Sequence, residues 1–316
     1  MKTISIENSE IYYSIALHLE LPSKYAYIGE GAHFWSELTK RWTKTGANTN
    51  SEAILLRDSI HQIAKEIKHA HPDKTIHVID LGCGNGGPAE IVCSALSKEE
   101  VLLRYTAVDI SSQMIDSALM RVQHAFHNEL QCSSFTFDFE SQSPKHIVEK
   151  LCSGQHINLF LFLGNTIGNY LHPHELVKGV ADAMSPQDYL IVGNGLVPKG
   201  DPNQLVKTYD IAEERQLLCS AAKRIGIPLK NIRFIWAPHG EVQALADIEH
   251  DILLRHHSQT VILREGTELL LLRSRKYTPK KLASLLTASG LRITQQWINP
   301  VQSNILLLGV RRTQDR

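Results

Sequence analysis

The chain has 316 residues, of which 43% are hydrophobic, and its 33 basic and 33 acidic residues cancel. This length and apolar content suffice for one large domain or two ordinary ones with a substantial core. The balanced charge, without a Lys/Arg stripe interleaved with aromatics, excludes the usual footprint of nucleic-acid binding and favours a small-molecule substrate.

Residue types that would indicate a metal, disulfide or membrane protein are scattered or missing. The five cysteines lack CxxC spacing, and the histidines lack HExxH spacing, so we expect neither a disulfide framework nor a metal site. No run approaches the roughly 18 to 20 apolar residues that span a membrane, and the first residues, MKTISIENSEIYYS, carry no apolar signal segment. We therefore expect a cytoplasmic protein without a membrane partner, and its oligomeric state stays open.

Residues 1–70 are predicted to be mostly helical, because apolar side chains recur at helical spacing between Phe34 and Trp42 and again between Ala53 and Ile67. After His71, short apolar runs alternate with amphipathic stretches, which is typical of βαβ units on a parallel sheet. We place strands at 76–81, 104–109, 133–138, 157–163 and 188–193, and helices near 88–97, 111–126, 142–152 and 173–184.

The alternation breaks between Pro198 and Arg275. A helix over 202–225 is followed by strand-like runs around 232–236, 244–255, 259–264 and 268–274, which together are too long for a loop. A helix over 279–289 and strands near 291–298 and 303–310 then finish the chain. We predict an α/β fold in which 1–70 and the insertion 198–275 form a substrate domain, and 71–197 and 276–316 form the sheet domain.

The stretch Ile76–Gly87, IHVIDLGCGNGG, reads as a buried strand running into a glycine turn. Gly82, Gly84 and Gly86 let the backbone turn sharply and approach a ligand closely. In an open parallel sheet, ligands bind at the carboxyl ends of the strands. A nucleoside cofactor is therefore expected at this turn.

Polar residues also end the next three predicted strands. Asp109 suits a ribose, because one carboxylate can accept hydrogen bonds from both hydroxyls. Asp138 and Gly164 follow at the later strand ends, the glycine together with Asn165. For Asp138 a solvated carboxylate or a local cap remains an alternative, and Asp109 has a similar structural alternative.

Two cofactor classes fit the glycine turn itself. Gly82, Gly84 and Gly87 formally match the GxGxxG dinucleotide pattern, but a helix N-terminus facing a pyrophosphate is less natural when Pro88 follows. DLGCGNG, with VDIS and a later acidic DF, instead resembles the S-adenosylmethionine loop of class I methyltransferases.

With these motifs, the chain resembles the amino-acid Nα-methyltransferases, a family that includes the histidine-trimethylating enzymes of ergothioneine biosynthesis and a fungal branch acting on dimethylallyltryptophan. The similarity extends from Lys24 to Val310 and is carried by KYAYIGEGAHFW, DLGCGNG, AVDIS, FLGNTIGNY, LVKTYD and EGTELLLLRSRKYTP. It implies a class I, S-adenosylmethionine-dependent methyltransferase fold, Rossmann-like with a mostly parallel seven-stranded sheet, beside a second α+β substrate domain.

The resemblance also implies roles for single residues. S-adenosylmethionine would contact the three glycines of the turn together with Asp109, Asp138, Phe139 and Gly164. Asn169 would hold the α-amino-acid end of the substrate with Tyr209. Tyr27 and Ser274 would close the pocket, and the catalytic residues would be Tyr27 and Tyr209, which could orient the amine or pass its proton to water.

Two departures from the family concern the substrate. Leu272 stands where the histidine enzyme has a glutamate that bonds the imidazole, two residues before the matching serine. Leaving polar nitrogens unpaired in a buried site costs roughly 1 to 3 kcal/mol each. The tyrosine pair that follows the first helix of the family is also missing from RWTKTGANTNSE, where Trp42 is the nearest aromatic. We therefore expect an amino-acid substrate less polar than histidine.

Three functions remain open on the sequence. The first is an S-adenosylmethionine-dependent N-methyltransferase acting on the α-amino group of an amino acid or derivative. The second is a protein that binds the same cofactor but has lost catalysis and acts as a partner or regulator. The third, a nicotinamide-dependent oxidoreductase, has only the glycine spacing in its favour.

Overall fold

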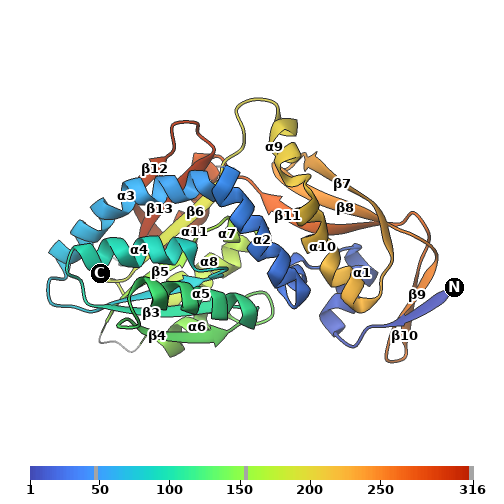
Figure 1. The fold of residues 1–316 in the computed structure, drawn as a ribbon, viewed down its shortest axis with the longest axis horizontal. Helices are drawn as coiled ribbons and strands as arrows, with labels where there is room; N and C mark the ends of the chain where they lie inside the picture. The colour runs from blue at the N-terminus through green and yellow to red at the C-terminus, as the bar shows by residue number, and fades with distance from the viewer. Residues whose placement is uncertain (46–48, 153–155, 313–316) are drawn as a thin grey trace. The chain divides into compact units, whose positions relative to one another are not determined.

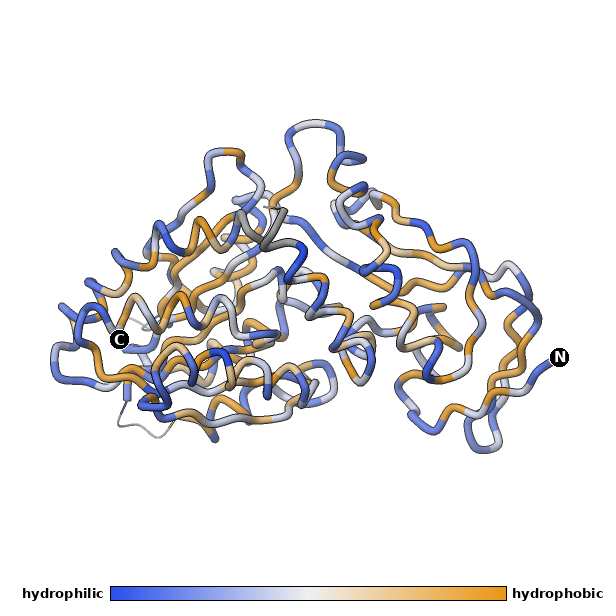
Figure 2. The backbone as a smooth tube through the Cα atoms, viewed as in Figure 1, coloured by the Kyte–Doolittle hydropathy of each residue, from blue (hydrophilic) through white to orange (hydrophobic). Residues whose placement is uncertain are grey.

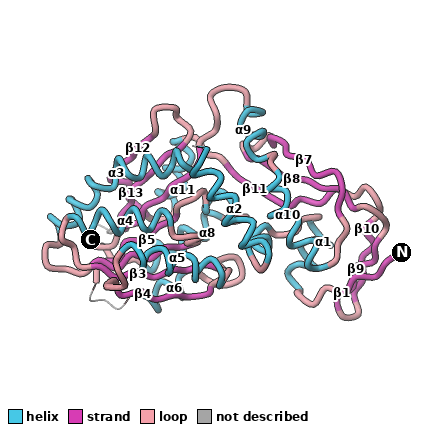
Figure 3. Tube along the Cα trace, in the orientation of Figure 1, coloured by secondary structure: helices cyan, strands magenta, loops and turns pink. Residues whose placement is uncertain are grey.

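The computed structural model describes residues 1–45, 49–152 and 156–312, with the backbone alone at 42–45 and 49–51. The chain forms two compact units. Met1–Arg41 and Pro198–Arg275 make up one, here called the insertion unit, and Trp42–Val197 and Lys276–Arg316 make up the other, the sheet unit. Figures 1 and 3 show the elements of both.

The sheet unit is built on seven strands in the order β12-β13-β6-β5-β2-β3-β4. β13 pairs antiparallel with both of its neighbours, and the other neighbouring strands are parallel. The prediction of a mostly parallel seven-stranded α/β sheet is confirmed. The strands are β2 (Ile76–Leu81), β3 (Leu103–Asp109), β4 (Gln131–Thr136), β5 (Ile157–Phe162), β6 (Tyr189–Gly195), β12 (Leu291–Ile298) and β13 (Asn304–Arg311).

Helices cover both faces of this sheet, because its central strands are apolar on both sides. In β5, Leu159 and Leu161 belong to one core cluster and Phe160 and Phe162 to the other, as the two-residue repeat of a strand requires. Figure 2 shows the central strands of the sheet as mostly hydrophobic. One cluster includes residues of α3 (Thr49–Ala70), α4 (Gly87–Lys98) and α5 (Ser112–Ala125), and the other includes residues of α6 (Pro144–Leu151), α8 (Pro173–Ala183) and α11 (Pro279–Ala288).

The insertion unit contains two three-stranded sheets, in the orders β1-β9-β10 and β11-β8-β7. In the part of the chain that the structure describes, no helix of either unit is long and apolar enough to cross a membrane. The helix α2 (Glu30–Thr45) begins in the insertion unit and passes into the sheet unit after Arg41. The other elements of the insertion unit are β1 (Lys2–Ser5), α1 (Ser9–His18), the 3-10 helix η1 (Ser23–Tyr27), α9 (Pro202–Tyr209), α10 (Ala212–Ile225), β7 (Leu229–Ala237), β8 (Glu241–Ile248), β9 (Ile252–His256), β10 (Gln259–Leu263) and β11 (Glu268–Arg275).

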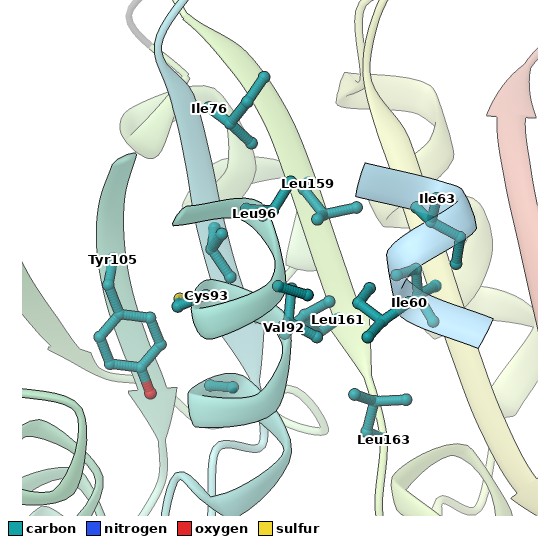
Figure 4. Packing of buried hydrophobic residues seen from close by; sticks show 14 of the residues in the cluster. Ile60, Ile63, Ile76, Val92, Cys93, Leu96, Tyr105, Leu159, Leu161 and Leu163 are labelled. Carbon is teal, nitrogen blue, oxygen red and sulfur yellow. The ribbon is translucent and has the colours of Figure 1, made fainter. Parts of the chain in front are cut away.

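Residues 42–70 belong to the sheet unit, so their predicted place in the substrate domain is wrong. The reason is the apolar stripe of α3, where Ile60 and Ile63 join the same buried cluster as Leu161 of β5. Figure 4 shows these side chains together. A helical repeat identifies a buried face but not the surface that buries it. That the two units serve as cofactor and substrate domains stays a prediction.

Three local predictions also differ from the structure. The helix expected over 202–225 is interrupted at Asp210, whose carboxylate accepts a hydrogen bond from Arg215 Nε at 2.7 Å. The strand expected over 244–255 is two strands in different sheets, β8 and β9. The N-terminal residues, expected to be helical, begin with β1, which pairs in parallel with β9, 250 residues further along at Ile252.

Candidate active site

The strand order of the sheet reverses beside β2. From β2 the chain continues through β3 to β4 on one side, and then returns with β5 and β6 on the other. This switch point is where open α/β sheets bind their ligands. The turns after β2 and β5 are in contact there, because a Cβ atom on Gly82 would lie 2.9 Å from Thr166 Cγ2.

The turn after β2 depends on its three predicted glycines. Gly82, Gly84 and Gly86 have φ values of +76°, +50° and +72°, a region that side chains with a Cβ disfavour. At Gly86 a Cβ would also lie 2.7 Å from the Cα atom of Ala118 in α5. The glycines therefore let the turn adopt its shape and pack closely against neighbouring elements.

Asp109 at the end of β3 is bound to this turn. Its Oδ2 accepts a hydrogen bond from the Gly84 N–H at 3.2 Å, and its Oδ1 accepts one from the Ser111 N–H at 3.0 Å. Burial raises the pKa of the carboxyl, although these backbone donors pull it down. A carboxylate has about four acceptor positions, so Asp109 keeps capacity for the ribose hydroxyls expected of it.

Asp80 at the end of β2 is a second buried carboxyl, to which the sequence analysis gave no separate role. Its Oδ2 accepts a hydrogen bond from the Tyr105 hydroxyl at 3.3 Å. Burial raises its pKa to about 7, with an added contribution from the nearby Asp109 and against the opposing effect of the Tyr105 hydrogen bond. The glycine turn is thus flanked by two acidic side chains held in a buried environment.

Asp138 and Phe139 follow β4. Asp138 Oδ1 accepts hydrogen bonds from the backbone of Glu140 at 2.9 Å and Ser141 at 3.4 Å, so it forms the local turn that was left open as an alternative. Phe139 is 7% exposed and packs edge-on against Phe162 and Tyr170. Their predicted contact with the cofactor remains a prediction.

The turn after β5 holds Gly164 and Asn169. A Cβ atom on Gly164 would meet nothing within 4 Å, so the backbone here borders open space. Its N–H donates to Glu52 Oε1 of α3 at 2.7 Å. Asn169, the last residue of the short helix α7 (Thr166–Asn169), accepts a hydrogen bond at its Oδ1 from Asn165 Nδ2 at 3.1 Å.

Two buried charged residues support this turn and were missed by the sequence analysis. Burial raises the pKa of Glu52 to about 7, while the Gly164 N–H and the positive charge of Lys276 lower it. Lys276 is 5% exposed, and its Nζ donates to Asn165 Oδ1 at 3.0 Å. They are 224 positions apart and follow no spacing rule, although Lys276 lies within a family motif, RSRKY.

The remaining predicted residues lie in the insertion unit. Tyr209, at the end of α9, and Ser274 of β11 share a hydrogen bond of 3.0 Å between their hydroxyls. Leu272 lies on the same face of β11 as Ser274 and is 3% exposed. The ring of Tyr27 meets Trp35 edge-on, with centroids 5.3 Å apart. The side chain of Trp42 lies outside the described residues.

The structure thus forms two groups of predicted residues, one in each unit. The glycine turn, Asp109, Gly164 and Asn169 meet at the switch point of the sheet unit. Tyr209 and Ser274 meet in the insertion unit. A single pocket that draws on both groups stays a prediction.

The switch point fits an adenosine-containing cofactor that lacks phosphates. The glycine turn offers closely approachable backbone, Gly164 borders open space, and Asp109 offers carboxylate acceptors. α4 begins with Gly87 and Pro88, and proline carries no N–H that could bind an anion at that helix start. Donors for a pyrophosphate are therefore fewer here than a dinucleotide would use.

Comparison with known proteins gives a family and two distant relatives. The profile of the family described as histidine-specific, S-adenosylmethionine-dependent methyltransferases matches residues 14–310. An N-methyltransferase of Aspergillus fumigatus, fsqC, is 20% identical over 267 residues, which are 80% of this chain and 70% of the relative. Ergothioneine biosynthesis protein 1 of Neurospora crassa is 21% identical over 308 residues, which are 93% of this chain but only 33% of that longer protein.

Solved structures are more distant in sequence. Magnesium protoporphyrin IX methyltransferase of Synechocystis, with S-adenosylhomocysteine bound, is 12% identical with a TM-score of 0.48, and the match covers 92% of this chain and 98% of that one.

Proposed function

Because the chain belongs to the family of histidine-specific, S-adenosylmethionine-dependent methyltransferases, we propose that it methylates the α-amino group of an amino acid, or amino-acid derivative, less polar than histidine. The chain is a methyltransferase that uses S-adenosylmethionine, with the class I fold, and its relatives support transfer to nitrogen of a small molecule. The acceptor and its side chain are the proposed part.

The observation that carries the proposal is the meeting of three strand-end motifs at the switch point: the glycine turn, Asp109, and the turn from Gly164 to Asn169. We assign the ribose to Asp109 and the backbone contacts to the glycines and Gly164, with Asp138 and Phe139 beside them. When bound, S-adenosylmethionine supplies an electrophilic methyl group carried by a sulfonium.

The protein's own contribution is orientation. Holding two reactants in line can supply roughly 7 to 11 kcal/mol in good intramolecular cases. Asn169 is proposed to hold the α-amino-acid end, and the Tyr27 and Tyr209 hydroxyls to orient the amine and pass its proton to water. The Tyr209–Ser274 hydrogen bond fixes one of these hydroxyls in the insertion unit.

Selectivity against histidine is proposed to come from β11. Leu272 places a buried alkyl side chain on the same face as the Ser274 hydroxyl, where an imidazole would need an acceptor. An unpaired polar nitrogen costs roughly 1 to 3 kcal/mol in such a site. An apolar substrate side chain needs no hydrogen-bond partner, and its contact with Leu272 would stabilise the bound substrate.

The direct test is incubation with S-adenosylmethionine labelled in its methyl group and a panel of single L-amino acids, including histidine, leucine, phenylalanine and tryptophan. We expect label in an apolar or aromatic amino acid and S-adenosylhomocysteine release at the same rate. Cofactor binding by calorimetry without transfer of label to any amino acid or cell extract would instead identify a non-catalytic binding protein.

A variant tests the role of Leu272. Leu272→Glu supplies a carboxylate acceptor and is expected to raise kcat/KM for histidine by at least tenfold over wild type. Leu272→Gln is the matched control, because it adds polarity of similar size without the charge and should gain less. Efficient methylation of histidine by the unmodified protein would contradict the proposed selectivity.

A further inference from the structure

The side chain of Asn165 connects three segments of the sheet unit, namely Lys276 after β11, the end of β6, and Asn169 in α7. Its Oδ1 accepts hydrogen bonds from Lys276 Nζ at 3.0 Å and from the Gly195 N–H, at the end of β6, at 3.1 Å. Its Nδ2 donates to Asn169 Oδ1 at 3.1 Å. These contacts form one directed series, from Lys276 and Gly195 through Asn165 to Asn169.

The direction of the series follows from the chemistry of its first donors. An ammonium group and a backbone N–H can only donate, so both must face an oxygen. Asn165 Oδ1 is therefore the atom facing Lys276 and Gly195, and Asn165 Nδ2 faces Asn169. Because an amide nitrogen only donates, it requires the oxygen of Asn169, and the Asn169 carboxamide is oriented as well.

The packing around the series holds it in place. Asn165 has φ +66°, a conformation that asparagine tolerates better than most residues. A Cβ atom on Gly195 would lie 3.0 Å from Lys276 Nζ, and one on Gly193 would lie 2.7 Å from Glu52 Oε2. Two glycines of β6 thus make room for the buried side chains of Glu52 and Lys276, and the positive charge of Lys276 lowers the pKa of the Glu52 carboxyl against the effect of burial.

We propose that Asn165 and Lys276 are positioning residues that orient the Asn169 carboxamide so that its NH₂ group faces the substrate. In residues 1–45, 49–152 and 156–312, no acceptor forms a hydrogen bond with Asn169 Nδ2. An NH₂ group recognises an acceptor, so the part of the substrate at Asn169 is the α-carboxylate of the amino acid. The carboxylate assignment rests on the proposed function, whereas the orientation of the two amides does not.

The orientation is tested by hydrogen exchange of side-chain amides in protein labelled with ¹⁵N-asparagine, with the signals assigned from Asn165→Asp and Asn169→Asp. We expect a protected Nδ2 proton on Asn165 and none on Asn169, and we expect Lys276→Met to lower the protection at Asn165, whose oxygen the Gly195 N–H still orients. Protection on Asn169 in place of Asn165 would overturn the series. This measurement needs no substrate.

The carboxylate assignment is tested by reversing the series. In Asn165→Asp, carboxylate oxygens still face Lys276 and Gly195, but an oxygen replaces the NH₂ group opposite Asn169, whose amide must turn and present its own oxygen. The probes are L-leucine, L-phenylalanine and L-tryptophan, each beside its α-carboxamide, which offers N–H donors where the acid offers only acceptors.

Wild type should prefer the acid, and Asn165→Asp should raise KM for the acid about 10- to 100-fold, change kcat little and shift the preference toward the amide. Lys276→Met should raise KM for the acid without favouring the amide. Unchanged S-adenosylhomocysteine affinity and circular dichroism would show that each variant folds. If a folded Asn165→Asp keeps the wild-type preference for the acid, the carboxylate assignment is wrong. If wild type methylates none of the probes, both that assignment and the proposed substrate class are wrong. In either case the amide exchange experiment decides the orientation independently.

Discussion

Glu52→Gln should make the stability of the sheet unit less sensitive to pH. Burial raises the pKa of the Glu52 carboxyl from 4.5 to about 7, against the opposing effects of Lys276 and the Gly164 N–H. Glutamine has nearly the same shape as the protonated carboxyl and retains an oxygen that can accept from Gly164. The substitution therefore removes the ionisation while keeping the contact.

The sign and size follow from proton linkage. Below pH 4.5 the group is protonated in both states, and between 4.5 and about 7 the folded state retains a proton that the unfolded state has lost. The free energy of unfolding therefore falls as pH rises through this window, by roughly 3 kcal/mol in total. Asp80 contributes a similar fall, but it is present in both proteins and cancels from their difference.

Urea unfolding at pH 5.0 and pH 8.5, followed by circular dichroism, measures this difference. We expect the free energy of unfolding of Glu52→Gln to be close to that of wild type at pH 5.0 and to exceed it by roughly 2 to 3 kcal/mol at pH 8.5. The surface substitution Glu129→Gln is the control and should show the pH dependence of wild type. Equal pH dependence in wild type and Glu52→Gln would refute the burial argument, and the ¹³C shift of the Glu52 carboxyl provides an independent titration.

Three further substitutions test the site. Asp109→Ala removes the carboxylate assigned to the ribose and should weaken S-adenosylmethionine binding at least 100-fold in calorimetry; unchanged affinity would contradict that assignment. Gly86→Ala should lower the free energy of unfolding by about 2 kcal/mol or more, because φ is +72° and the new Cβ would lie 2.7 Å from Ala118 Cα. Gly87→Ala, at the first residue of α4 and without a positive φ, is the control and should stay within about 0.5 kcal/mol of wild type in the same urea experiment. Tyr209→Phe removes the hydroxyl bonded to Ser274 and should lower kcat about tenfold or more in the labelled-methyl assay, and an unchanged kcat would exclude Tyr209 from handling the amine.

Local patterns were enough to predict the sheet and the cofactor motifs. β2, β3, β5, β6 and β13 lie close to their predicted ranges, because a strand buried on both faces is a short apolar run between polar turns. The glycines of the turn and the Ser111 cap of α5, whose Oγ accepts from the Met114 N–H at 3.4 Å, depend only on neighbouring residues. Such features are encoded within a few positions of the chain.

Contacts between distant positions could not be predicted in this way. The apolar stripe of α3 fits either unit until its partner surface is known, and β1 becomes a strand only because β9 is available to pair with it. Leu272 and Ser274 could be related to each other by the two-residue repeat of a strand, but the bond from Ser274 to Tyr209, 65 positions away, requires the folded insertion unit.

The glycine turn, Asp109 and the family were therefore determined by the sequence alone, because each depends on residue types at short, fixed spacing. Glu52, Asn165 and Lys276 became functional candidates only in the tertiary structure. Burial raises the pKa of Glu52, Lys276 carries its charge in the interior, and a hydrogen bond from Lys276 orients the amide of Asn165. All three depend on packing between distant parts of the chain, which no short segment contains.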